Sequence, residues 1–156
     1  MPKVIITDTT VLILFQKISR LDLLNQVYEE IITTSEVAAE YGDELPAWIR
    51  IQSVTDKKYQ ELLELQVDKG EASAIALAKE YSDVLLLLDD LKARKLAAKL
   101  DLKYTGTLGI ITKAKNEGLI DMVKPVLDKI QNTDFRISNT ILKEFLLLNN
   151  EDVQKR

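Results

Sequence analysis

The feature that most constrains the fold is a repeated alternation of short apolar runs with longer helix-like segments. Val4–Thr7 is a β-branched run, and the five consecutive apolar residues Val84–Leu88 are typical of a strand covered on both faces. Alternation of buried strands with helices indicates a parallel sheet, because parallel neighbours are joined by helical crossovers. We therefore predict a three-layer α/β/α fold with a central parallel sheet of about four or five strands.

Further elements follow from the same patterns. Residues 31–34 and 103–105 read as short strands, and the alternating segment 48–54 indicates an edge strand. We expect a single domain over residues 1–150 and a frayed tail over 151–156. Helices are expected at residues 11–19, 21–28, 35–41, 55–67, 71–81, 91–100, 121–131 and 138–148. A further helix is expected to open from a turn at residues 106–109 and to close at Gly118.

Composition excludes several kinds of chemistry. The chain has no His and no Cys, which removes Ser-His-Asp catalysis, cysteine nucleophiles and the common zinc sites. No glycine precedes Gly42, so the first strand lacks the glycine-rich turn of a dinucleotide-binding module. There is neither a signal-peptide pattern nor an apolar run of about 18 residues. We expect a soluble, cytoplasmic protein that does not associate with a membrane.

Acidic residues follow two of the predicted buried strands. Asp8 ends the first strand, and Asp89 and Asp90 end the strand at 84–88. In an open parallel sheet, ligands bind beyond the carboxyl ends of the strands, where strand order reverses. Each acid alone is explained as a helix cap. Glu71 in the first turn of its helix is explained by the helix dipole, and Glu40 as a surface residue.

If these acids converge, their repulsion requires a cation to neutralise them. Ligands that are all oxygen atoms favour hard cations, so the expected ion is Mg²⁺ or Mn²⁺. Such an ion activates water and offsets charge on a phosphodiester without a histidine. The predicted chemistry is metal-dependent hydrolysis of a phosphodiester.

Charge is unevenly distributed along the chain. Residues 29–90 contain 15 acidic and 5 basic side chains, whereas residues 91–115 contain 7 basic side chains and only Asp101 as an acid. Two solvated helix faces would explain this division. The alternative is that basic residues following Asp89 and Asp90 hold flanking phosphates. The candidates are Lys92, Arg94, Lys95 and Lys99, with Arg94 the first choice.

The order of these motifs resembles the PIN-domain family, small α/β nucleases that include the VapC-like toxins of toxin–antitoxin pairs. The resemblance covers nearly the whole chain. It is closest to a prokaryotic branch with Gly-Glu-Ala-x-Ala-Ile-x-Leu-Ala, Asp-Asp-x-x-Ala-Arg and Gly-Thr-Leu-Gly motifs. The matching segments are Ile6–Thr10, Glu40, Gly70–Ala78, Leu87–Arg94 and Gly106–Gly109.

The resemblance implies cleavage of single-stranded RNA with Mg²⁺ or Mn²⁺, a homodimer and, for a toxin, an antitoxin partner. Asp8 would be the central metal ligand, Glu71 and one of Asp89 or Asp90 would complete the metal set, and Glu40 would be an outer catalytic acid. Many family members have Asp at the position of Glu71, and a single acid in place of the doubled Asp.

Three threonines are also carried over from the resemblance. Thr9 or Thr10 would orient the attacking water, and Thr107 would line the nucleic-acid groove. The rival interpretation is a catalytically weak or inactive PIN-like module that binds nucleic acid or a partner protein through the same edge of the sheet.

The amphipathic N-terminal segments allow two interpretations. Their apolar residues could form a dimer face or pack on the sheet, and core packing is the preferred prediction. The residues concerned are Leu14, Ile18, Leu21 and Leu24.

Overall fold

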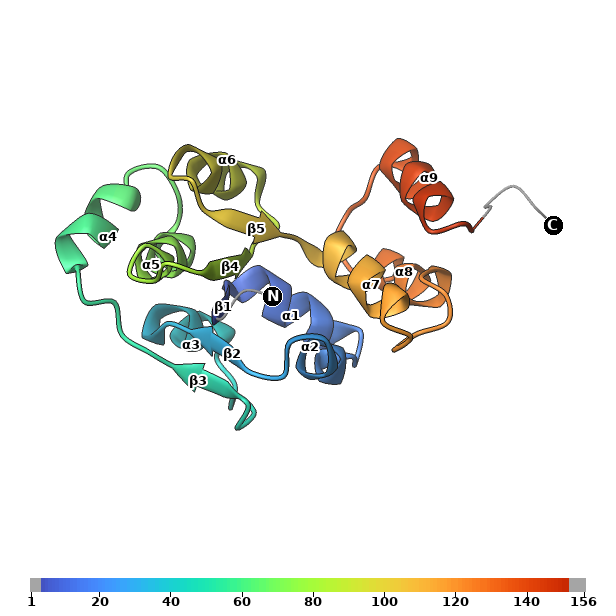
Figure 1. Cartoon of the computed structure of the whole chain (residues 1–156), viewed down its shortest axis with the longest axis horizontal. Coiled ribbons are helices and arrows are strands. Elements are labelled where there is room, and N and C mark those ends of the chain that lie inside the picture. The colour runs from blue at the N-terminus through green and yellow to red at the C-terminus, as the bar shows by residue number, and fades with distance from the viewer. Residues whose placement is uncertain (1–3, 152–156) are drawn as a thin grey trace.

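The structure, a computed structural model, describes residues 4–151 of the chain. Within these residues, five strands form one sheet in the order β3-β2-β1-β4-β5, and all neighbouring strands are parallel (Figure 1). The predicted parallel sheet is confirmed, and so is the edge position of the segment 48–54. The strands are β1 (Val4–Thr7), β2 (Ile31–Thr33), β3 (Ile49–Ile51), β4 (Val84–Leu87) and β5 (Lys103–Thr105).

Helices cover both faces of the sheet. Successive residues of a strand point to opposite faces, so a strand can supply side chains to both apolar cores. Ile5 packs into one apolar core and Ile6 into the other, which confirms the three-layer prediction. The helices of the first core are α1 (Thr9–Lys17), α2 (Leu21–Tyr28), α7 (Thr107–Asn116), α8 (Lys124–Gln131) and α9 (Asn139–Leu148). Those of the second are α4 (Lys57–Leu63), α5 (Lys69–Ala78) and α6 (Leu91–Lys99).

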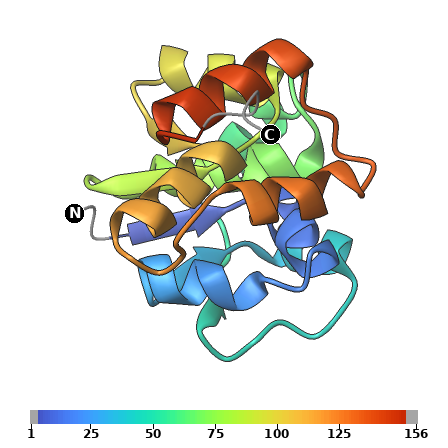
Figure 2. The same ribbon diagram turned by 90° about the vertical axis from the view of Figure 1, so that its right-hand side faces the viewer.

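The remaining helix, α3 (Ser35–Tyr41), contacts both α1 and α5. The last three helices, α7, α8 and α9, pack into the first core, and Figure 2 shows them in orange and red in front of the sheet. Among residues 4–151, no helix is both long enough and apolar enough to cross a membrane.

β1 is the middle strand of the sheet, and the later strands lie on both sides of it. β2 and β3 are added on one side, then β4 and β5 on the other, so strand order reverses between β1 and β4. These two strands are in register from Val4 opposite Val84 to Thr7 opposite Leu87. The backbone N–H of Asp8 then donates to the Leu87 carbonyl at 3.2 Å. The segments that follow both strands therefore lie side by side at the edge where open α/β sheets bind ligands.

The N-terminal apolar residues pack inward, as preferred from the sequence. Leu14, Ile18 and Leu24 are buried, and Leu21 packs against the same core. Two separate helices form here, because Ser19 adopts a positive φ of 59° between them. The segment belongs to the core of the fold.

The boundary between α4 and α5 differs from the prediction. The ranges expected from the sequence are 55–67 and 71–81; α4 instead ends at Leu63, and α5 begins at Lys69. The cause is a capping box, in which the Asp68 carboxylate accepts from the Glu71 N–H and the Glu71 carboxylate accepts from the Asp68 N–H. Gly70 therefore lies inside the helix.

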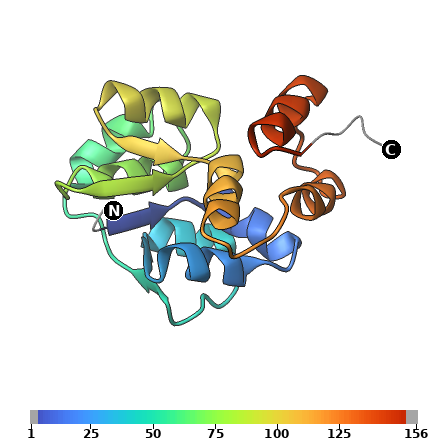
Figure 3. The same ribbon diagram turned by 45° about the vertical axis from the view of Figure 1, so that its right-hand side comes forward.

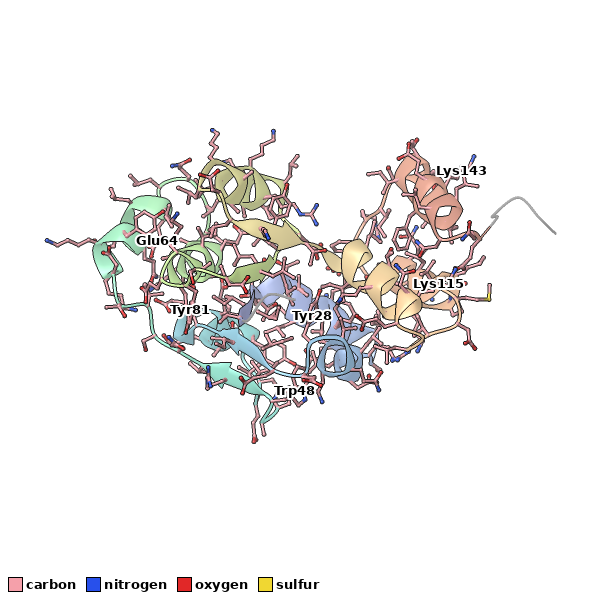
Figure 4. All side chains as sticks on the ribbon, viewed as in Figure 1. Tyr28, Trp48, Glu64, Tyr81, Lys115 and Lys143 are labelled. Atoms are coloured by element: carbon pink, nitrogen blue, oxygen red, sulfur yellow. The ribbon has the colours of Figure 1, made fainter. Side chains whose placement is uncertain are left out.

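The C-terminal part of the described chain is anchored by Glu151. This residue is the first of the expected tail 151–156, and residues 152–156 lie outside the described part. Glu151 is buried, and its carboxylate accepts from the backbone N–H groups of Val123 (2.8 Å) and Lys124 (3.1 Å). Lys115 of α7, labelled in Figure 4, donates to the same carboxylate at 2.8 Å. One side chain thus joins the start of α8 to α7.

Burial acts to raise the pKa of the Glu151 carboxyl, but the hydrogen bonds from Lys115, Val123 and Lys124 outweigh it and hold the pKa below its ordinary value of 4.5. A group with a lowered folded pKa stabilises the fold above its unfolded pKa. That stabilisation is lost as the pH falls through the folded value.

Glu151→Gln should therefore lower the free energy of unfolding by about 1–3 kcal/mol near neutral pH, because it removes charge-assisted hydrogen bonds. Urea unfolding at a series of pH values should show the difference from wild type shrinking below about pH 4.5. Glu144→Gln, at an exposed acid of α9, is the control and should change stability by less than about 0.5 kcal/mol. A Glu151→Gln effect that is constant with pH would contradict the role of the charge.

Candidate functional site

Asp8 lies at the end of the middle strand and caps α1. Its Oδ1 accepts from the Val11 N–H at 3.1 Å, which is the N-cap interaction predicted from sequence. The residue is only 1% exposed, and within residues 4–151 its Oδ2 has no hydrogen-bond partner. A buried carboxylate oxygen without a donor is unfavourable unless a proton or a cation satisfies it.

The charges around Asp8 make an ionised carboxylate at this position still less favourable. Burial raises the pKa of the Asp8 carboxyl well above 3.8 against the opposing hydrogen bond from Val11, and the nearby charges of Asp89, Glu71 and Asp68 raise it further. These acids come from three elements, which are β1, the start of α5 and the end of β4. The structure therefore brings the predicted acids into electrostatic range of one another.

Glu71 is 8% exposed and titrates far from its ordinary range. Burial raises its pKa, as do the charges of Asp68, Asp90 and Glu40, while the hydrogen bond from the Asp68 backbone opposes them; the result is a pKa of about 7. Asp68 was not among the predicted site residues. The pattern of an Asp three residues before Glu71, a capping box, is the sequence signal that identifies it.

Glu40 reaches the same site from α3. The Thr9 hydroxyl donates to Glu40 Oε1 at 2.6 Å, and a Cβ added at Gly70 would collide with that oxygen. Gly70 therefore leaves the space that the Glu40 carboxylate occupies. A cavity of about 350 Å³ is lined by Asp8, Thr9, Thr10, Ile13, Glu40, Asp68 and Glu71.

The two adjacent aspartates after β4 have different roles. Asp90 is exposed and caps α6, where its Oδ2 accepts from the Ala93 N–H at 3.0 Å. Asp89 is instead directed to the start of α7, where it accepts from the backbone N–H of Thr107 at 2.8 Å and from its hydroxyl at 2.6 Å. Thr107 thus fixes the orientation of the Asp89 carboxylate.

Arg94 is the basic residue of α6 that turns toward the site. Its Nε donates to the Leu88 carbonyl at 2.7 Å, its Nη2 lies 3.8 Å from Asp89 Oδ1, and its guanidinium lies 5.4 Å from the centre of the Tyr104 ring. A Cβ at Gly106 would collide with this guanidinium. The other basic residues of the run are exposed on α6 and do not line the cavity that contains Arg94; these are Lys92, Lys95 and Lys99.

The acids are near one another, but they do not form a compact cage. Within residues 4–151, no three carboxylates are grouped closely enough to hold a metal ion as they stand. Each has another hydrogen bond, since Asp8 and Asp90 cap helices and Asp89 is bound by Thr107. The residues nevertheless suit a hard cation, because all candidate ligands are oxygen atoms and the buried Asp8 Oδ2 has no donor among the residues that the structure describes.

The fold and the site together define an open α/β protein with an acidic centre at the point where strand order reverses. A sequence model described as a PIN domain matches residues 4–151, and the chain belongs to the PIN-domain family. PIN domains are generally nucleases, and they typically use divalent metals. Comparison with curated proteins and with solved structures finds no match.

Gly70→Ala should displace the Glu40 side chain without lowering the stability of the fold. Alanine is the better helix former, and the exposed Glu40 side chain can move away, so the free energy of unfolding should stay equal or rise by up to about 1 kcal/mol. The hydrogen bond between Thr9 and Glu40 should be lost, which a crystal structure of the variant would show. Destabilisation by more than about 2 kcal/mol would mean that the backbone, and not Glu40, meets the new methyl group.

Asp8→Asn should stabilise the metal-free protein. The amide retains an oxygen for Val11 and removes a buried charge, so urea unfolding in a chelator should show a gain of about 1–3 kcal/mol. Asp90→Asn makes the same chemical change at an exposed helix cap and should alter stability by less than about 0.5 kcal/mol. Equal effects of the two substitutions would show that the buried charge of Asp8 is not a source of instability.

Proposed function

We propose that the protein is a metal-dependent endoribonuclease that cleaves single-stranded RNA. The observation that carries the proposal is the buried Oδ2 of Asp8, which has no hydrogen-bond partner in the described part of the chain and is surrounded by the charges of Asp89, Glu71 and Asp68. A structural helix cap does not need these neighbours, because Oδ1 alone caps α1. Membership of the PIN-domain family supports nuclease chemistry for such a centre.

In this proposal, Asp8, Glu71 and one of Asp89 or Asp90 hold a Mg²⁺ or Mn²⁺ ion. When bound, the ion supplies an activated water and neutralises charge on the phosphodiester. Asp89 is the better placed of the adjacent pair, because its charge acts on Asp8 and Thr107 fixes its carboxylate. Asp90 is occupied as the cap of α6 and acts on Glu71 through its charge.

The chain's polar side chains position these acids. Thr9 holds the outer acid Glu40 by a hydrogen bond, and Thr10 lines the same cavity, where its hydroxyl would orient the attacking water. Such supporting hydrogen bonds tune a metal site through the groups that they orient. On the other side, Arg94 and Lys92 are the proposed contacts to RNA phosphates, and Arg94 is supported by its place beside Asp89.

A non-catalytic PIN-like module remains the second candidate. The observation that favours it is the complete engagement of Asp89, whose two oxygens accept from Thr107 while Arg94 lies nearby. If Asp89 never leaves Thr107, it can position nucleic acid without serving as a metal ligand. A toxin role with an antitoxin partner and a homodimer is also proposed, and its support is the family resemblance.

Cleavage of a mixed single-stranded RNA pool should require Mg²⁺ or Mn²⁺ and stop when a chelator removes the ion. Asp8→Asn should lower the rate at least about 100-fold, because it removes the central charge. Thr107→Val should lower it about 10- to 100-fold through loss of the bond to Asp89. Gel analysis of labelled RNA provides the measurement.

Lys143→Ala, on the outer side of α9 (Figure 4), is the control and should cleave like wild type. Equal metal-dependent cleavage by wild type and Asp8→Asn would disprove the catalytic assignment. Binding of RNA without any cleavage by wild type would favour the non-catalytic module.

A further inference from the structure

The cavity lined by Asp8, Glu40 and Glu71, called here the acidic cavity, is not the only cleft at this edge. A second one, called here the basic cleft, lies on the side of β5 and the C-terminal helices. It has a volume of about 440 Å³, within the range of about 300–1,000 Å³ typical of small-ligand sites. Its walls come from the end of β5, the start of α7 and the segment between α8 and α9, which lies across from β5 in Figure 3. The residues that matter here are Asp89, Arg94, Tyr104, Phe135 and Arg136.

The charge of this cleft is opposite to that of the acidic cavity. The charged residues lining the acidic cavity are Asp8, Glu40, Asp68 and Glu71, all of them acids. Two arginines, Arg94 and Arg136, line the second cleft against one acid, Asp89. One end of the site therefore suits a cation and the other an anion such as a phosphate group.

A shallow hollow connects the two. It has a volume of about 320 Å³, and it shares Thr10 and Ile13 with the acidic cavity and Phe135 with the basic cleft. A chain molecule can therefore run from Glu40 across Ile13 and past Phe135 to the arginines without leaving the surface. This continuity indicates an extended ligand.

The basic cleft also offers aromatic surface. Tyr104 is 38% exposed although it is a large hydrophobic residue, and the Arg94 guanidinium lies over its ring, 5.4 Å from the ring centre. Phe135 lines the same cleft. Exposed aromatic rings beside arginines are the combination that binds unpaired nucleobases by stacking while the cations hold the phosphates.

We propose that this cleft is a nucleotide subsite, which holds one unstacked base of single-stranded nucleic acid on Tyr104 and its phosphate on Arg136. The inference rests on the proposed nuclease function and adds the position of the strand that flanks the cleaved bond. Single-stranded substrate is required, because a base within a duplex cannot reach a side-chain ring. An acidic peptide would satisfy the arginines but would leave the exposed ring of Tyr104 without a role.

Binding can be measured apart from cleavage in an Asp8→Asn background. Fluorescence anisotropy with one labelled single-stranded RNA and the DNA of the same sequence gives the affinity of each. Tyr104→Leu should weaken binding roughly 5- to 150-fold, the effect of losing one stacked base. Tyr104→Phe retains the aromatic face and should bind like the parent.

A set of oligonucleotides with one abasic position each then locates the base. One position should weaken binding to the parent protein and have no effect in Tyr104→Leu, because the lost base and the lost ring form one interaction. Arg136→Ala should reduce the slope of log affinity against log salt by about 0.7, the value for one phosphate of a single strand. Lys143→Ala is the matched control, and its slope should be unchanged.

Equal affinity of Tyr104→Leu and the parent protein would overturn the subsite, even if wild type cleaves RNA. Binding of an acidic peptide without binding of either oligonucleotide would also overturn it. Tyr104-dependent binding by a protein whose wild type cleaves nothing would support the subsite and disprove the nuclease proposal. Binding of RNA but not DNA supports a subsite that also contacts the ribose.

Discussion

The site depends on one unfavourable condition, a carboxylate buried at the end of the middle strand. Transfer of a carboxylate out of water is costly unless hydrogen bonds or a counter-charge replace its hydration. Val11 donates a hydrogen bond to one oxygen of Asp8, and the other has no partner among the described residues. The charges of the surrounding acids make ionisation of this carboxyl still less favourable. The fold therefore contains a charge that its own described residues do not neutralise. Such a centre favours binding of a cation, and the free energy of that binding offsets the unfavourable burial.

Sheet topology determines which groups can reach this charge. Because strand order reverses between β1 and β4, segments distant in sequence approach one edge from both sides. Two glycines then permit close approach, since a Cβ at Gly70 would displace Glu40 and a Cβ at Gly106 would displace Arg94. One glycine serves the acidic side and the other the basic side. The same edge consequently carries both an acidic cavity and a basic cleft.

Local patterns predicted most of the elements and the positions of the acids at helix starts, because burial and capping leave signals within a few residues. Glu71 is an example, and Asp68 could have been found from the same capping box. Contacts across the fold left no such signal. The bond between Asp89 and Thr107 joins residues 18 positions apart, and Arg136 lies in an irregular segment without a motif. Its place beside the site depends on how α8 and α9 pack, which local periodicity does not determine.

For every acid at the end of a strand, the sequence allows two interpretations, a helix cap or a functional ligand. The structure differs in this respect between the ends of β1 and β4. At Asp8, one carboxylate allows both tasks, since Oδ1 caps α1 while the buried Oδ2 has no hydrogen-bond partner within residues 4–151. After β4, Asp90 caps α6, whereas Asp89 accepts from Thr107 and acts on Asp8 through its charge. A single aspartate there would have to supply the cap and the site charge together. The doubled Asp thus supplies a helix cap at Asp90 and a second carboxylate at Asp89, and both charges reach the site, since Asp89 acts on Asp8 and Asp90 acts on Glu71.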